Sequence, residues 1–110
     1  MLTIRLAPGF QEDLQSLENR DIQRLAQYLV TQIALNSDEM RLRPLSWVKH
    51  VGDLRGCLAI KFDLLGYQNR FRLIFEYLPD DENPTEVIFW EVGPRFGYHV
   101  YRAAASRRSH

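Results

Sequence analysis

The chain has 110 residues, enough for one domain (1–110) around a single hydrophobic core, and its 14 basic and 14 acidic residues cancel, which argues against a general nucleic-acid-binding protein. Its single cysteine, Cys57, excludes a disulfide framework and a cysteine-based zinc site. No signal peptide is recognisable and no apolar run approaches the ~20 residues that span a bilayer, so we expect a cytoplasmic protein without membrane contact.

The N-terminal third of the chain predicts a strand followed by two helices. Residues 2–6 alternate apolar and polar side chains, as a half-buried strand does. Apolar residues then recur at helical spacing over 10–19 and, with the clearest periodicity in the chain, over 22–33. Either Asn19 or Asp21 is expected to cap the second helix. A helical hairpin therefore follows the first strand.

The rest of the chain predicts an antiparallel meander. Residues 41–56 are loop-like, and three alternating segments follow at 57–63, 70–77 and 85–93, joined by short connections rich in turn residues. Residues 96–108 are expected to form a last short helix. The order β-α-α-β-β-β with a short C-terminal helix predicts an α+β fold, in which a mostly antiparallel sheet carries the helical hairpin, and its helices in general, on one face.

Each of the three alternating segments presents one apolar face. The residues predicted to form these faces are Leu58, Ile60 and Phe62; Phe71, Leu73, Phe75 and Tyr77; and Ile88, Trp90 and Val92. Arg70 and Arg72 both fall on the opposite face of their segment. The sheet is therefore expected to carry positive charge on the face that does not build the core.

Two basic side chains are predicted to stand opposite each other on that face. If the first hairpin turn is centred on residues 66 and 67, Lys61 lies directly across from Arg72. Like charges opposed across a ladder destabilise it by ~0.2–1 kcal/mol, a cost that a sheet accepts more readily where an anion binds. The alternatives are that both side chains are solvated, or that Arg72 pairs with Glu76 or Asp63.

Charge is also segregated along the chain. Residues 41–75 and 95–110 are rich in arginine and lysine, whereas acids collect in 12–39 and 76–91. If the two basic segments meet in the fold, the molecule has one positive face, and such faces attract polyanions whatever the net charge. Chance clustering of surface charge is the alternative.

A further group of functional side chain types follows the last predicted strand. Arg95 comes just after it, and the planar fork of arginine suits phosphate. His99 titrates near neutrality, and Tyr101 has a ring that can stack on a base and a hydroxyl that can exchange a proton. Each also has an ordinary interpretation, such as an ion pair from Arg95 to Glu91. Together they indicate a site for a phosphate-bearing ligand.

At these residues the chain resembles the RelE/ParE superfamily of bacterial toxin–antitoxin toxins, over nearly its whole length. The segments that carry the resemblance are "PLSWVKHVGDLRG", "LRGCLAIKF" followed by "RFRLIFEY", "VIFWEVGPR", and Val100-Tyr101 at the family's distance from Arg95.

The RelE branch implies a ribosome-dependent mRNA endonuclease that uses no metal or other cofactor, in which a ribose 2′-OH attacks the adjacent phosphate and the 5′-oxygen leaves. By position, Lys61 matches a catalytic lysine, Arg72 and Arg95 match two phosphate-binding arginines, and Tyr101 matches a tyrosine of the site. His99 is a candidate from its own chemistry alone. The remaining basic residues expected to contact RNA are Lys49, Arg55, Arg70 and Arg102.

The resemblance leaves two other functions open. ParE-type relatives share the fold but bind DNA gyrase and cleave no RNA, and a degenerate member would bind only its antitoxin. In each case the resemblance implies a cognate antitoxin whose extended segment wraps the helices and a sheet edge, folding as it binds. The joint presence of Lys61, Arg95 and Tyr101 favours the RNase, with the ribosome and its mRNA as further partners.

Overall fold

The computed structural model describes residues 2–35, 43–44, 54, 56–64, 70–80, 82–94 and 99–108, with the backbone alone at 43, 44 and 99. The elements in chain order are β1 (Thr3–Leu6), α1 (Phe10–Gln15), α2 (Arg20–Ala34), β2 (Arg43–Pro44), β3 (Leu58–Phe62), β4 (Phe71–Leu78), β5 (Glu86–Pro94) and α3 (His99–Arg108). None of the helices in this part of the chain is long and apolar enough to cross a membrane.

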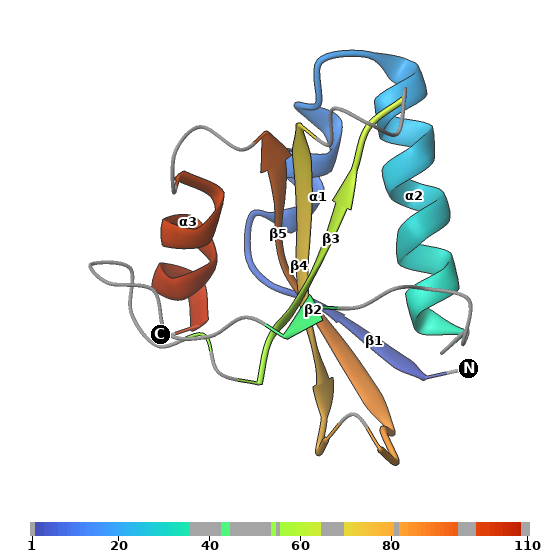
Figure 1. Ribbon diagram of the computed structural model, residues 1–110, viewed down its shortest axis with the longest axis vertical. Helices are drawn as coiled ribbons and strands as arrows, with labels where there is room; N and C mark the ends of the chain where they lie inside the picture. The colour runs from blue at the N-terminus through green and yellow to red at the C-terminus, as the bar shows by residue number, and fades with distance from the viewer. Residues whose placement is uncertain are drawn as a thin grey trace.

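The strands form one five-stranded sheet in the order β1-β5-β4-β3-β2 (Figure 1). The edge strand β1 runs parallel to β5, and every other neighbouring pair is antiparallel. The predicted α+β fold with a mostly antiparallel sheet is therefore confirmed. The short β2 lies in a segment that we expected to be a loop, and it pairs with the start of β3.

The helical hairpin is confirmed, although its first helix is shorter than expected. Asn19 caps α2, because its side-chain oxygen accepts a hydrogen bond from the Ile22 amide at 2.9 Å. The Gln23 side chain donates to the carbonyl oxygens of Gln15 at 3.1 Å and Leu17 at 3.2 Å. These bonds satisfy the carbonyl groups of the last residue of α1 and of a residue just beyond it, so the chain leaves the helix at Gln15 and not near Asn19.

The two faces of the sheet are covered by different helices. The main core lies between the sheet and the hairpin, and the strand residues in it include Leu58, Ile60, Phe62, Phe71, Leu73, Phe75 and Tyr77, as predicted. A smaller cluster of buried side chains lies between α3 and the other face of the sheet, and it consists of Leu54, Cys57, Ala59, Ile74, Val100 and Ala104. Figure 1 shows α2 and α3 on opposite sides of the sheet. The expectation that all helices pack on one face is wrong, because this face also carries apolar side chains, such as Ala59 and Ile74, that α3 covers.

A bulge in β5 changes which of its side chains enter the main core. Glu91 pairs with Ile74 and Phe89 pairs with Phe75, so Trp90 is an extra residue between two paired positions. The alternation of side chains along β5 therefore changes phase at Trp90. The β5 residues in the main core are Val87, Phe89 and Val92, which corrects the predicted shared face of Ile88, Trp90 and Val92.

Candidate active site

Lys61 and Arg72 are directly opposed in the β3–β4 ladder, as the sequence predicted. Arg72 is paired on its other side with Gly93 of β5, which carries no side chain. The strand neighbours of Arg72 on the main-core face are Phe71 and Leu73, so Arg72 and Lys61 project toward the α3 side of the sheet. Two cationic side chains thus stand next to each other beside the start of α3.

Arg72 is far more buried than a cation on a sheet surface would be. Only 4% of its surface is exposed, whereas Lys61 is exposed. Its Nη1 donates a hydrogen bond to the Phe71 carbonyl oxygen at 3.0 Å. Its Nε donates to the hydroxyl oxygen of Tyr101, which lies in the first turn of α3, at 3.1 Å. The alternative in which Arg72 is solvated is therefore wrong, because α3 covers this part of the sheet.

The acids that the sequence offered as partners of Arg72 are engaged elsewhere. Glu76 accepts two hydrogen bonds from Arg108, both at 3.1 Å. Asp63 accepts hydrogen bonds from Arg70, from Nε at 2.8 Å and from Nη2 at 3.2 Å. The hydrogen bond to the Tyr101 hydroxyl directs Arg72 toward α3.

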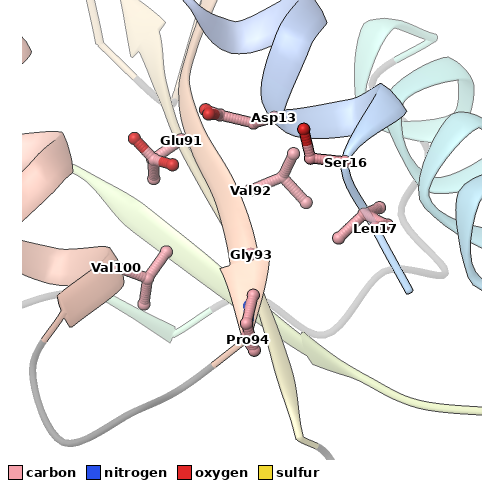
Figure 2. Close-up of a pocket in the computed structure, with 8 residues that line it drawn as sticks. All are labelled: Asp13, Ser16, Leu17, Glu91, Val92, Gly93, Pro94 and Val100. Atoms are coloured by element: carbon pink, nitrogen blue, oxygen red, sulfur yellow. The ribbon is translucent and has the colours of Figure 1, made fainter.

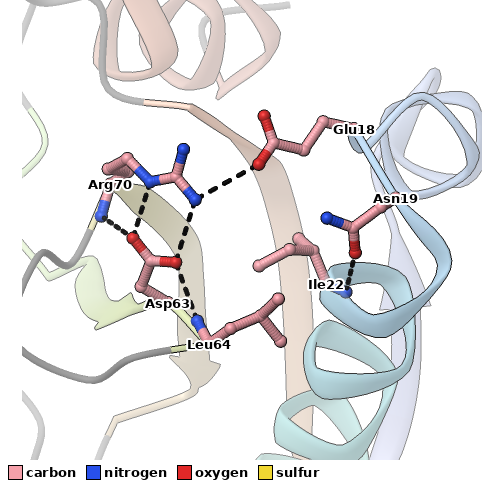
Figure 3. Close-up of polar contacts among 6 residues, drawn as sticks. All are labelled: Glu18, Asn19, Ile22, Asp63, Leu64 and Arg70. Carbon is pink, nitrogen blue, oxygen red and sulfur yellow. Dashed lines mark hydrogen bonds and ion pairs between the residues drawn. The ribbon is translucent and has the colours of Figure 1, made fainter.

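Arg70 does not share the environment of Arg72. Its guanidinium forms ion pairs with Asp63 at 2.8 Å and with Glu18 of the α1–α2 connection at 3.2 Å (Figure 3), and it lies 5.3 Å from the centre of the Phe71 ring. Its hydrogen bonds lower the pKa of the Asp63 carboxyl to about 2. Arg70 therefore points toward the hairpin, which corrects the prediction that it shares a face with Arg72. A contact between Arg70 and RNA stays a prediction.

The other predicted site residues are only partly placed by the structure. Arg102 is exposed on α3, next to Tyr101. The backbone of His99 begins α3, but its side chain lies outside the described residues, as do Lys49, Arg55 and Arg95. The predicted site residues whose side chains the structure describes are thus Lys61, Arg70, Arg72, Tyr101 and Arg102, of which Arg70 points toward the hairpin.

A pocket of about 210 Å³ opens beside the end of β5, between α1 and the start of α3 (Figure 2). Asp13 and Glu91 both line it, and both contact Arg107 of α3. Arg107 Nη1 lies 2.5 Å from Asp13 Oδ2 and 2.8 Å from Glu91 Oε2. Burial and the neighbouring Asp13 carboxylate raise the pKa of Glu91 from 4.5 to about 8, although the positive charge of Arg107 acts to lower it.

The sequence did not single out these ion pairs. Arg107 and Arg108 were counted only as part of a basic segment, but each is paired with a carboxylate, so neither adds to a positive face. The available signal was that Glu76 and Glu91 lie between apolar residues of predicted strands, where a buried carboxylate requires a cationic partner.

The arrangement suits chemistry on a phosphate. Lys61 and Arg72 supply positive charge, and the Tyr101 hydroxyl accepts from Arg72, so its own proton points away from that guanidinium and toward other acceptors. Among the described residues, no group of three or more histidine, cysteine or acidic side chains is arranged to hold a metal ion.

No family model matches the sequence, and no curated protein is significantly similar to it. Two solved structures are similar to the chain. One is a double mutant of the E. coli toxin RelE in the free state, with a TM-score of 0.61, 16% identity and 96% of each chain covered. The other is the toxin–antitoxin complex RelBE2 from Mycobacterium tuberculosis, with a TM-score of 0.56, 20% identity, and 86% of this chain and 98% of that chain covered. The chain therefore has the fold of the RelE toxins.

Proposed function

We propose that this chain is the toxin of a toxin–antitoxin pair and acts as a ribosome-dependent mRNA endonuclease. The observation that carries the proposal is the cluster of Lys61, Arg72 and Tyr101 on one side of the sheet. The likeness to E. coli RelE supports it at the level of the fold.

The proposed reaction is an internal transfer at phosphorus. The ribose 2′-oxygen forms a bond to the adjacent phosphorus and loses its proton, while the bond from phosphorus to the 5′-oxygen breaks and that oxygen gains a proton. The products are a 2′,3′-cyclic phosphate and a 5′-hydroxyl. Such a step requires groups that take up and deliver protons, and cations beside the pentacoordinate phosphorus.

The described side chains have distinct roles in this proposal. Arg72 places positive charge beside the phosphate, and its burial strengthens that charge because little water screens it. Tyr101 directs its hydroxyl proton toward substrate and serves in proton transfer. Lys61 is exposed and neutralises the phosphate from the neighbouring strand. Arg95 and His99 follow β5 in sequence and are proposed to complete the site.

We also propose that a cognate antitoxin covers the β1 edge of the sheet. All four residues of β1 are exposed, and Ile4 and Leu6 leave 43% and 46% of their surfaces uncovered. The Thr3 and Ala7 amides bond to carbonyls of the β5 side, so the amide and carbonyl groups of Ile4 point away from β5. An extended antitoxin segment that adds a strand there would cover both the polar edge and the apolar side chains.

Induction of the chain in bacteria tests the proposed function. Protein synthesis is expected to stop first, with cuts in ribosome-bound messages, before any DNA damage response. Intact messages together with an early DNA damage response would favour gyrase binding instead.

Expression from the native operon tests the partner, which we expect to be a small acidic protein. The wild-type chain should co-purify with that protein, and a chain carrying Ile4→Lys and Leu6→Lys should lose it while still cleaving RNA. Equal retention of the antitoxin by the double variant would place its binding surface elsewhere.

A further inference from the structure

The helix that carries Tyr101 has little apolar surface to hold it. It has ten residues, fewer than an isolated helix needs to be stable in water. Its fully buried side chains are Val100 and Ala104, and the buried residues that form a cluster with them are Leu54, Cys57, Ala59 and Ile74. The helix therefore contributes two fully buried apolar side chains to its contact with the sheet, and polar contacts near its end add to them.

A first polar attachment is made by Arg107. Its Nη1 and Nη2 donate to both carboxylate oxygens of Asp13 at 2.5 Å and 3.2 Å, and Nη1 also donates to the Trp90 carbonyl oxygen at 2.8 Å. Glu91 lies against the same guanidinium. The backbone makes room for it, since a Cβ at Gly9 would lie 2.6 Å from Nη2, and Gly9 has the left-handed φ of 89°.

A second attachment is made by Arg108 and leads to a different strand. Its Nε and Nη2 each donate at 3.1 Å to one carboxylate oxygen of Glu76 on β4. The Trp90 indole donates to the same carboxylate at 3.2 Å and so fixes its orientation. Gly56, with φ 91°, lies directly against this ion pair, because a Cβ there would be 3.5 Å from Glu76 Oε2.

The two attachments together fix the rotation of α3. Neighbouring residues on a helix point about 100° apart, so Arg107 and Arg108 leave the helix in different directions, one toward α1 and β5, the other toward β4. One ion pair would leave α3 able to turn about its axis. A turn of about 10° moves an atom about 6 Å from the axis by about 1 Å. That is enough to break the hydrogen bond between Arg72 and Tyr101.

We propose that Arg107 and Arg108 are positioning residues, whose two divergent ion pairs fix the rotation of α3 and so hold the Tyr101 hydroxyl against Arg72. The consequence for cleavage rests on the proposed function, in which both of those residues act on the phosphate. A displacement of about 1 Å in a reacting group lowers a rate by about 10²-fold. Arg107 and Arg108 thereby act on the reaction through Tyr101, without contact with the RNA.

The structural half of the proposal is tested by NMR on the whole chain, with labelled tyrosine rings and arginine side chains. Arg108→Lys and Arg107→Lys keep the charge but cannot form the two-pronged contact with a carboxylate. Each variant should shift the signals of the Tyr101 ring and the Arg72 Nε–H while the core signals stay in place. Arg24→Lys, an exposed position on α2, is the matched control. Unmoved Tyr101 and Arg72 signals in both lysine variants would overturn the proposal.

The functional half is tested by a double-mutant cycle on cleavage of ribosome-bound mRNA. Arg108→Lys should slow cleavage about 10-fold or more in the wild-type background but add nothing to Tyr101→Phe, because its effect passes through that hydroxyl. Additive losses would overturn the positioning role. A wild-type chain that cleaves no ribosome-bound mRNA would instead refute the proposed function, and the NMR result would still decide whether Arg107 and Arg108 position Tyr101.

Discussion

Replacing Tyr101 by phenylalanine tests the proposed site with a small change in structure. The substitution keeps the ring, which packs at the edge of the small cluster under α3, and removes the hydroxyl that accepts a hydrogen bond from Arg72 at 3.1 Å. A hydrogen bond to a charged group contributes about 1.5–3 kcal/mol when buried. Tyr101 is only partly buried and water can replace part of this bond, so we expect a loss of about 1 kcal/mol.

That loss is small enough to leave the chain folded at assay temperature. It corresponds to a fall in melting temperature of roughly 4–8 °C for a domain near this size. The effect on cleavage should be much larger, since a positioned proton-transfer group contributes about 10²–10⁴ in rate. The assay is single-turnover cleavage of a message on programmed ribosomes, with melting temperatures measured in the same buffer.

Tyr28→Phe is the matched control, because Tyr28 lies on α2 with 51% of its surface exposed. It removes the same atom and should change neither the melting temperature nor the cleavage rate. Wild-type cleavage by the Tyr101→Phe chain would refute the assignment of Tyr101. A collapse of the fold would refute the view that its hydroxyl contributes little to stability.

Three other substitutions have effects set by burial and charge. Arg72→Ala should lower both the melting temperature and the cleavage rate, because the side chain that it removes is only 4% exposed. The expected loss of folding stability is about 2–3 kcal/mol, and unchanged stability would contradict the burial of Arg72. Lys61→Ala removes an exposed charge, so it should change folding stability by less than about 0.5 kcal/mol while slowing cleavage about 10²-fold. An unaltered cleavage rate would show that Lys61 is not part of the site. Burial raises the folded-state pKa of Glu91 to about 8 from an ordinary 4.5, so its protonation stabilises the fold fully below pH 4.5, and this contribution is lost as pH rises through about 8. Melting temperatures of wild type should therefore fall between pH 5 and pH 9 more steeply than those of Glu91→Gln, and parallel curves would argue against the raised pKa.

The register of the central hairpin could be predicted because its physical cause is local. Leu58, Ile60 and Phe62 must face the same core as Phe71 and its neighbours, and a slip of one residue would turn every apolar side chain to the wrong face. Together with the expected turn centred on residues 66 and 67, that constraint places Lys61 opposite Arg72. The predicted cross-strand pairing of Lys61 with Arg72 is accordingly confirmed.

The errors arose where tertiary contacts override a simple period. Alternation along β5 gives no sign of the bulge at Trp90, which depends on pairing with β4. The alanines of α3 give it almost no amphipathic pattern, so its position over Arg72 could not be read from the sequence. Arg70 alternates in phase with Arg72, but it precedes β4 and its side chain follows the attraction of Asp63 and Glu18 to the opposite side.

The chemistry of the RNA ends tests whether this chain is a ribosome-dependent endonuclease. The purified chain is incubated with bacterial ribosomes carrying a defined message, and the 3′ ends of the fragments are identified. We expect cuts that occur only when ribosomes are present and that leave 2′,3′-cyclic phosphate and 5′-hydroxyl ends. An intact message, together with inhibition of purified DNA gyrase by the same preparation, would contradict it.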